Sequence, residues 1–269
     1  MRISINAIAV RGPGLPGWQA ARERMAGRVA WRPEPLSLPV IELLSANERR
    51  RLTPLIKLAL AVACEATQDM QPEARAALPA VFASSAGDSQ ITHRLCTAMS
   101  QSPGMVSPTD FHNSVHNAPA GYWSIATASR MASISIAAGE WTAGAGFLEA
   151  ISQVQATGQE ILLVIYDALP PASLMPLSRI QDGFGLALRI APAEFMSAQG
   201  VGCDIRICAH AETRLPEPWA SLSRLGPTAR WIGLPHAIAC RQLRVVMPLD
   251  ARRNVELALE WVDHGKSRF

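Results

Sequence analysis

Charged and aromatic residues are scarce in this chain. Of its 269 residues, 17% are Asp, Glu, Lys or Arg and 6% are aromatic, whereas 49% are hydrophobic. This composition excludes an intrinsically disordered chain, because such chains combine low hydrophobicity with high charge. The length and apolar content suffice for one large domain or two small ones with a sizeable core. The low charged fraction also indicates that a partner covers much of the surface.

The chain also lacks an excess of one charge. It has 25 Lys and Arg against 22 Asp and Glu, which gives a formal net charge of +3. A protein that attracts nucleic acid electrostatically concentrates basic residues on one face. The near balance therefore predicts that nucleic acid is not a partner.

No cysteine motif, membrane span or secretion signal is evident. The five cysteines include no Cys-x-x-Cys pair, and Cys203 and Cys208 are not spaced as zinc ligands. No apolar run approaches the roughly 18 residues of a membrane helix. Residues 1–18 lack the apolar core and cleavage site of a signal peptide. We therefore expect free thiols in a reducing cytoplasm, no membrane span, no metal and no cofactor.

What the chain does contain is an alternation of strand and helix patterns. Continuous apolar runs such as 160–166 are typical of strands buried on both faces. The expected strands are 2–10, 79–83, 133–137, 160–166, 186–190, 203–210 and 242–247. The expected helices are 19–25, one that Ser45 caps and that runs to Ala63, 92–99, 119–128, 142–156 and 251–263. This order predicts an α/β fold with a layered architecture.

Residues 133–150 (SISIAAGEWTAGAGFLEA) are the most informative segment. An alternating strand meets a tight turn at Ala138 and Gly139, and a helix then opens with small residues from Thr142. Such an elbow presents a side chain at a helix N-terminus, where backbone N–H groups favour negative charge. In an enzyme that side chain is usually a nucleophile. Here the elbow carries Glu140 and Trp141, so the frame of a catalytic site lacks Ser or Cys at its apex.

This elbow, together with the motif DGFG at 182–185, resembles the β-ketoacyl synthases of the thiolase-like superfamily. In those enzymes the elbow reads approximately S-x-S-x-A-T-A-C-x-x-G, and the Cys takes the acyl chain. Counting forward from Ser133 places the Cys position on Glu140, and counting back from Gly158 places it on Trp141. The resemblance implies a thiolase-like layered fold that has lost its nucleophilic thiol.

The resemblance covers residues 1–192, the ketoacyl-synthase-like N-terminal half. Residues 193–269 are expected to be a shortened C-terminal remainder packed on the same domain. The catalytic histidines of the family lie in the second half, and no segment like G-T-x-T-x-x-G-D carries the first of them here. Chain-length factors, which are synthase-like subunits without the Cys, show the same loss. This chain is most similar to the short subgroup found in bacterial aryl polyene systems, which make xanthomonadin-type pigments.

The resemblance also implies an interface, because Asn117 and Gly121 match a helix near the synthase dimer contact. The expected partner-interface residues are His112, His116, Asn117, Gly121 and Tyr122. Two histidines four residues apart can also hold a metal on one helix face. Pro119, however, begins a helix and leaves both histidines in the preceding loop, and no third ligand stands at a recognisable spacing.

Aromatic residues near the elbow are the expected lining of an acyl pocket: Trp123, Trp141 and Phe147. Each of them can equally be a core residue. Glu140 has three readings, since it can complement the helix dipole, contact a partner, or take part in chemistry. An acid–base role needs a second titratable group, and the elbow contains no His.

The resemblance implies a catalytically inactive chain-length factor that forms a heterodimer with an active β-ketoacyl synthase. The pair would act on chains carried by an acyl carrier protein, and this subunit would shape their elongation. Two alternatives stay open. One is a residual enzyme that uses Glu140, either a malonyl decarboxylase or a divergent acyltransferase. The other is a homodimeric protein that binds acyl chains or carriers.

Overall fold

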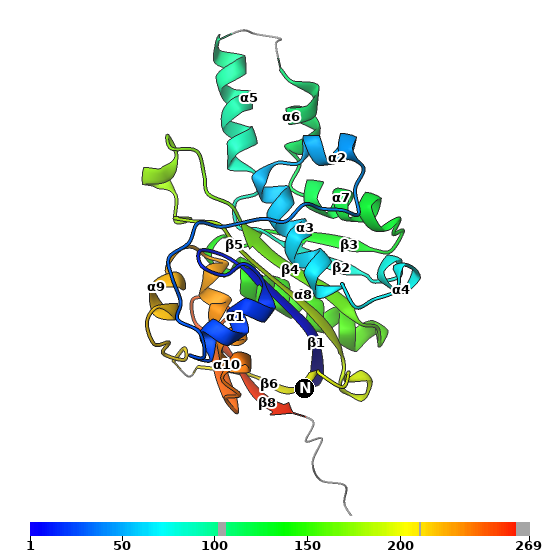
Figure 1. Ribbon diagram of the computed structural model, residues 1–269, viewed down its shortest axis with the longest axis vertical. Coiled ribbons are helices and arrows are strands. Elements are labelled where there is room, and N and C mark those ends of the chain that lie inside the picture. The colour runs from blue at the N-terminus through cyan, green and yellow to red at the C-terminus, as the bar shows by residue number, and fades with distance from the viewer. Residues whose placement is uncertain (102–105, 210, 262–269) are drawn as a thin grey trace, which may run out of the picture.

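An eight-stranded mixed sheet forms the centre of the computed structural model, which describes residues 1–101, 106–209 and 211–261. Its strands follow the order β3-β2-β4-β5-β1-β6-β8-β7 (Figure 1). Their bounds are β1 Arg2–Arg11, β2 Ala80–Ala83, β3 Ser133–Ile136, β4 Ile161–Asp167, β5 Phe184–Pro192, β6 Val201–Cys208, β7 Arg244–Pro248 and β8 Asn254–Trp261. The predicted layered α/β fold is confirmed.

The sheet has a parallel part and an antiparallel part. Strands β3, β2 and β4 run parallel, so their carboxyl ends meet at one edge. The remaining pairs, from β4–β5 to β8–β7, are antiparallel. Every residue of β2, β4 and β5 is buried, which agrees with their continuous apolar sequences.

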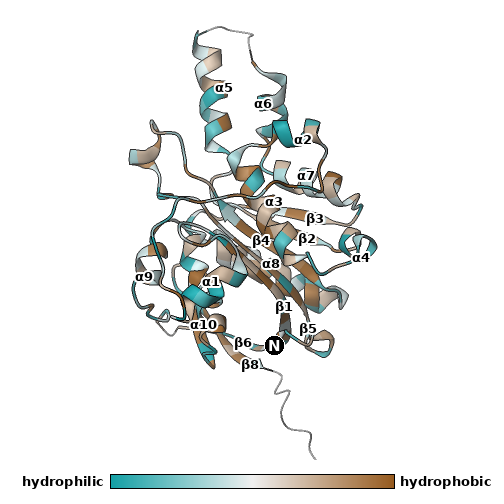
Figure 2. Cartoon of the chain, in the orientation of Figure 1, coloured by the Kyte–Doolittle hydropathy of each residue, from teal (hydrophilic) through white to brown (hydrophobic). Residues whose placement is uncertain are grey.

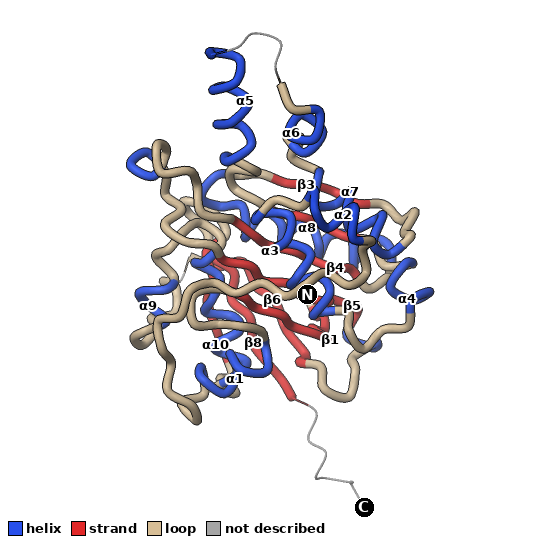
Figure 3. The backbone as a smooth tube through the Cα atoms, turned by 45° about the horizontal axis from the view of Figure 1, so that its top comes forward, coloured by secondary structure: helices blue, strands red, loops and turns tan. Residues whose placement is uncertain are grey.

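Helices cover both faces of the sheet (Figures 1 and 3). Their bounds are α1 Trp18–Met25, α2 Ala46–Arg51, α3 Pro54–Ala66, α4 Pro72–Ala76, α5 Ser89–Gln101, α6 Pro108–Asn113, α7 Ala118–Thr127, α8 Thr142–Thr157, α9 Trp219–Leu222 and α10 Gly233–Ala239. Short 3₁₀ turns are η1 Gly139–Trp141, η2 Met175–Leu177, η3 Ala193–Phe195 and η4 Ala229–Ile232. Helices α3 and α7 share one hydrophobic core with the sheet, and α1, α8 and α10 share the other.

Two sequence predictions need correction. The helix expected at 251–263 is wrong over its described part, because residues 254–261 form strand β8. There Val255, Leu257 and Leu259 are buried in alternation, which is the period of a strand. The long helix after Ser45 is also two helices. It breaks before Pro54, whose ring disfavours helical backbone in the preceding residue, and Thr53 then caps α3 by accepting from the Ile56 amide at 3.2 Å.

Helices α5 and α6 project beyond the layers as an arm (Figure 1). Only Ile91 of α5 is buried, so the sheet core does not hold the outer part of the arm. Arg94 joins the two helices by a two-pronged ion pair with Asp110, at 2.7 and 2.9 Å. The hydrogen bond from Arg94 lowers the pKa of the Asp110 carboxyl. Figure 2 shows that hydrophilic stretches are common in this arm, whereas the strands are mainly hydrophobic.

Candidate functional site

The predicted elbow is present between β3 and α8. Gly139 has φ of 56°, a left-handed conformation that glycine adopts without strain, and it opens the η1 turn that carries Glu140 and Trp141. Thr142 then fixes the turn, because its hydroxyl accepts from the Ala138 amide and donates to the Gly139 carbonyl, each at 2.8 Å. Helix α8 begins at Thr142.

Small residues at the start of α8 allow its close approach to the sheet. A Cβ on Gly144 would lie 2.7 Å from the Leu249 backbone, and one on Gly146 would lie 2.7 Å from the Cβ of Ala83. The small-residue run that the sequence places after the elbow therefore has a packing cause. It brings the elbow against the end of β2 and the segment after β7.

Both residues at the former nucleophile position contact arginines. Glu140 forms an ion pair with Arg179, which comes from the loop between β4 and β5. The Trp141 ring faces the Arg230 guanidinium, 4.8 Å from its centroid. Arg230 also pairs with Glu212. These contacts give the carboxylate a fixed positive partner and leave the indole beside a second cation.

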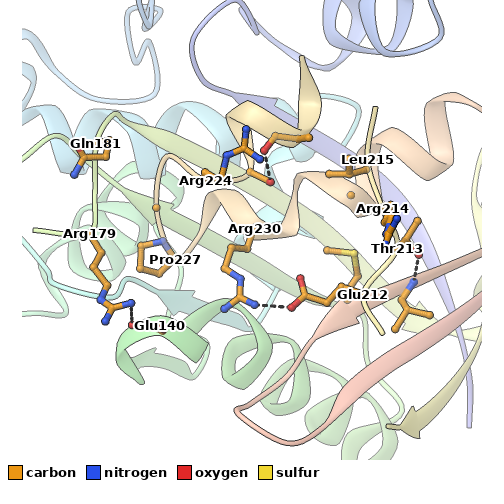
Figure 4. A pocket seen from close by; sticks show the side chains of 16 residues that line it. Glu140, Arg179, Gln181, Glu212, Thr213, Arg214, Leu215, Arg224, Pro227 and Arg230 are labelled. Atoms are coloured by element: carbon orange, nitrogen blue, oxygen red, sulfur yellow. Dashed lines mark hydrogen bonds and ion pairs between the residues drawn. The ribbon is translucent and has the colours of Figure 1, made fainter. Parts of the chain in front are cut away.

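The elbow opens into a cavity of about 760 Å³ (Figure 4). Its lining combines residues of the elbow with residues of four later segments: Glu140, Arg179, Gln181, Glu212, Thr213, Arg214, Leu215, Ala220, Ser223, Arg224, Gly226, Pro227, Arg230, Gly233, Val246 and Met247. This lining contains no His and no Cys. We call this cavity the arginine pocket.

The sequence did not point to the arginine pocket, because no motif links its residues. Its four arginines are spread over positions 179–230 and come together only through the fold. Only the elbow indicated a site in the sequence, because a strand-to-helix elbow usually faces a binding or catalytic pocket.

No cysteine replaces the missing thiol. Burial raises the pKa of the Cys64 thiol to about 11 and that of Cys203 to about 12, so both are protonated near neutral pH. None of the five cysteines lies in the elbow or lines the arginine pocket.

A buried polar cluster joins the carboxyl ends of β2 and β4, beside the elbow strand. Asp167 is 1% exposed and accepts from the Ser84 hydroxyl at 3.0 Å, the Ser85 amide at 2.9 Å and the Ser85 hydroxyl at 2.7 Å. Burial raises the pKa of the Asp167 carboxyl, and these hydrogen bonds oppose that shift. Sequence reasoning missed this carboxylate, although it ends a strand next to a Ser-Ser pair that ends the neighbouring strand.

The expected interface residues lie around α6 and α7. His112 is in α6 rather than in a loop, with its ring edge-on to Tyr122 at 6.5 Å. His116 precedes α7 and contacts the Ser84 carbonyl through Nε2 at 3.0 Å. Tyr122 is buried and donates to Asn113 at 3.1 Å. In the described part of the chain, no group of three or more His, Cys, Asp or Glu side chains is placed to hold a metal.

Asn117 and Gly121 are exposed on the same stretch of chain, and a Cβ on Gly121 would meet nothing within 4 Å. A glycine in a helix interior costs stability relative to alanine, and no close contact with a described residue requires it at that position. Their assignment to an interface stays a prediction.

The three expected acyl-pocket residues lie apart. Trp123 belongs to the core on the α3 side of the sheet, and Phe147 belongs to the opposite core, 5.0 Å from the Trp231 ring. Only Trp141 stands beside the arginine pocket, through Arg230. An acyl pocket lined by these residues stays a prediction.

The β3 edge of the sheet is open. Strand β3 pairs with β2 on one side, and no described strand pairs with its outer side. Exposed apolar side chains occur on β3, just before it, and on helix α7, which contacts it: Ile134, Met131 and Ile125. Unpaired backbone groups beside apolar side chains are a surface on which another chain can add.

Comparison with solved structures finds proteins of similar fold. A ketosynthase in complex with its chain length factor from Xenorhabdus doucetiae matches with a TM-score of 0.72 and 18% identity, over 96% of this chain and 99% of that chain. The ishigamide ketosynthase/chain length factor matches with a TM-score of 0.71 and 12% identity, over 97% and 99%. A β-ketoacyl synthase from Burkholderia phymatum matches with a TM-score of 0.57 and 11% identity, over 89% of this chain and 70% of that one. At these identities the likeness shows the fold.

Two further comparisons concern sequence and membrane character. A search of curated proteins finds no match. Among the described residues, no helix has both the length and the hydrophobicity to cross a bilayer. The family model of the β-ketoacyl synthase N-terminal domain matches residues 18–220 of the 269. The chain therefore belongs to the β-ketoacyl synthase N-terminal domain family.

Proposed function

We propose that this chain is a catalytically inactive chain-length factor that forms a heterodimer with an active β-ketoacyl synthase. In that complex it completes the acyl pocket and guides elongation of a polyene-type chain carried by an acyl carrier protein in the cytoplasm. Residues 193–269 serve as the shortened second half, since β6, β8 and β7 continue the sheet that residues 1–192 begin.

The residue at the apex of the elbow carries this proposal. A condensing enzyme needs a nucleophile that takes an acyl group, and a thiol is suited to that task. This chain has Glu140 at the counted position, held by Arg179. A carboxylate does not replace a thiol as the group that takes up an acyl chain, and the lining offers no His to assist acid–base chemistry. The elbow therefore serves shape rather than acyl transfer.

The open β3 edge supports the pairing. A partner strand added beside β3 would satisfy its outer backbone groups and cover the exposed apolar side chains near it. Helix α7 packs beside β3, and no described residue lies within 4 Å of a Cβ placed on Gly121, which permits close approach of a second backbone. Solved complexes of a ketosynthase with its chain length factor share this fold.

The test is co-expression with a cysteine-bearing β-ketoacyl synthase encoded nearby, followed by mass measurement and product analysis. We expect a stable one-to-one complex, and chain extension only when both subunits are present. The synthase Cys→Ala variant should abolish extension. The Glu140→Gln variant of this chain should leave it within about threefold, because a shape role needs no charge.

The alternative enzyme predicts a different result. A decarboxylase that uses Glu140 would release carbon dioxide from malonyl carrier protein without any partner, and Glu140→Gln would remove that activity. Absence of a complex, or partner-free turnover that depends on Glu140, would overturn the proposal.

A further inference from the structure

The lining of the arginine pocket carries an excess of positive charge, to which the proposed shape role of the elbow assigns no function. Four arginines and two glutamates line it, so the lining carries a net charge of +2. Glu217 adds a counter-charge outside the lining, at 3.4 Å from Arg224, but both side chains are more than half exposed. Such an exposed pair is screened by solvent and leaves most of the positive field in place.

Donors remain available on these arginines. Arg179 and Arg230 each use one terminal nitrogen in their ion pairs with Glu140 and Glu212. A guanidinium has five N–H donors in a planar fork, so most of each fork is open to a ligand. Arg214 makes no hydrogen bond or ion pair with any described residue and faces the same cavity (Figure 4).

The rest of the lining is apolar. Leu215, Pro227, Val246 and Met247 line the cavity together with the charged groups. A volume of about 760 Å³ lies within the range of small-molecule sites. The contact with the Trp141 ring limits the freedom of the Arg230 guanidinium, which lowers the entropy lost when a ligand binds.

We propose that the arginine pocket binds a phosphate ester, with the phosphate on the arginines and the organic part on the apolar lining. A phosphate monoester carries about −1.5 to −2 charges near neutral pH, which matches the lining charge better than the single charge of a carboxylate. Because the lining lacks His and Cys, this is a binding site rather than a site of hydrolysis. The proposal does not depend on pairing at β3, because the arginines that would hold the phosphate come from segments after β4 and not from β3 itself.

The test uses phenyl phosphate as the probe, with benzoate and phenol as controls that share its ring. Calorimetry on the purified protein, alone or in its complex, should show phenyl phosphate binding at least tenfold more tightly than benzoate, with phenol not binding. Added salt should weaken the binding, since the attraction is between charges.

Matched variants locate the site. Arg214→Gln should weaken phenyl phosphate binding at least fivefold without changing the melting temperature, because Arg214 has no partner among the described residues to lose. Arg206→Gln removes the same charge at an exposed position of strand β6, outside the pocket, and should leave binding unchanged. Equal binding of benzoate and phenyl phosphate, or equal loss in both variants, would overturn the proposal.

A second pair of probes, coenzyme A and pantetheine, distinguishes which kind of phosphate ester the pocket binds. Coenzyme A binding in an Arg214-dependent manner, with pantetheine not binding, supports a site for phosphorylated pantetheine groups. Phenyl phosphate binding with no coenzyme A binding supports a site for smaller phosphate esters. If neither phosphate ester binds, the proposal fails, whatever the outcome of the pairing experiment.

Discussion

The two edges of the sheet are treated in opposite ways. At the β7 edge, the chain covers its own strand: the Thr213 amide donates to the Val246 carbonyl at 3.0 Å, and the Thr213 hydroxyl accepts from the Val246 amide at 2.8 Å. Four of the five β7 residues are buried. At the β3 edge, no described strand covers the outer side, and Ser133 and Ile134 are exposed.

The difference between the two edges indicates where a partner chain would bind. Proteins protect exposed strand edges, because an unprotected edge pairs with other chains. This chain covers the β7 edge with its own segment and leaves the β3 edge open beside apolar side chains. We infer that the β3 edge is the one that pairs with another chain.

The open edge is tested first, with Ile134→Lys. Ile134 is 39% exposed, so the substitution should leave the fold intact. A lysine on an edge strand blocks pairing, because its charge would be buried in the new interface. We expect the affinity for the synthase partner to fall at least 100-fold by calorimetry. The matched control is Leu243→Lys, at a residue that is 75% exposed and lies beside the closed edge. It should change the affinity for the synthase partner less than threefold. Equal losses would show that the open edge has no special role.

The closed side is tested next, with Gly144→Ala. The new Cβ would lie 2.7 Å from the Leu249 backbone and 2.9 Å from the Pro248 carbonyl, so α8 must move away from the end of β7. We expect a loss of about 2–3 kcal/mol in the free energy of unfolding, measured with urea. Gly121→Ala, with nothing within 4 Å of its Cβ, should be neutral or stabilising by up to about 1 kcal/mol. A neutral Gly144→Ala would contradict the close packing.

Removing the cover of β7 should have a smaller effect. Thr213→Val deletes the acceptor of the Val246 amide, while the backbone bond from residue 213 remains. The free energy of unfolding should fall by about 1 kcal/mol. Thr157→Val removes an exposed hydroxyl that donates to the Gln153 carbonyl at 2.8 Å and accepts from the Gln159 amide at 3.2 Å. Because water can replace both partners at this exposed site, the change in stability should be less than about 0.5 kcal/mol. A Thr213 variant as stable as this control would indicate that the cover is dispensable.

The smallest effect concerns pH and the buried Asp167 at the end of β4, one strand in from β2 and the open edge. Its pKa is raised by burial above the ordinary 3.8, so folding favours the protonated form. Its contribution to stability is therefore greatest below the unfolded-state pKa and is lost as pH rises through the folded-state pKa. Relative to Asp167→Asn, the natural chain should lose stability as pH rises from about 4 toward 7. Urea unfolding at several pH values measures this difference, and a difference independent of pH would contradict the assignment.

Local patterns were enough to predict the layers and the elbow. Strands such as β4 have continuous apolar sequences, and the turn at Gly139 before Thr142 has few other conformations available. Strand β8 was mistaken for a helix, because Val255, Leu257, Ala258 and Trp261 also fit a helical face. Residues 254–261 form a strand because they pair with β6, which is distant in sequence, and with the nearby β7.

The arginine pocket could not be predicted for a related reason. Arg179, Arg214 and Arg230 belong to separate segments, and only the packing of α8 against the chain after β7 places the elbow among them. The resemblance to ketoacyl synthases pointed to the elbow and to the missing thiol. It could not indicate which side chains surround Glu140: Arg179 belongs to no motif of the resemblance, and Glu212, Arg214 and Arg230 lie beyond residue 192, where the resemblance ends.

The central claim is that this chain has kept the synthase frame in order to pair with an active synthase. The most direct test is native mass measurement of the two chains after co-expression and purification through a tag on this chain alone. The account predicts a one-to-one heterodimer that Ile134→Lys dissociates and Leu243→Lys does not. A homodimer or monomer of this chain with no synthase bound would contradict it.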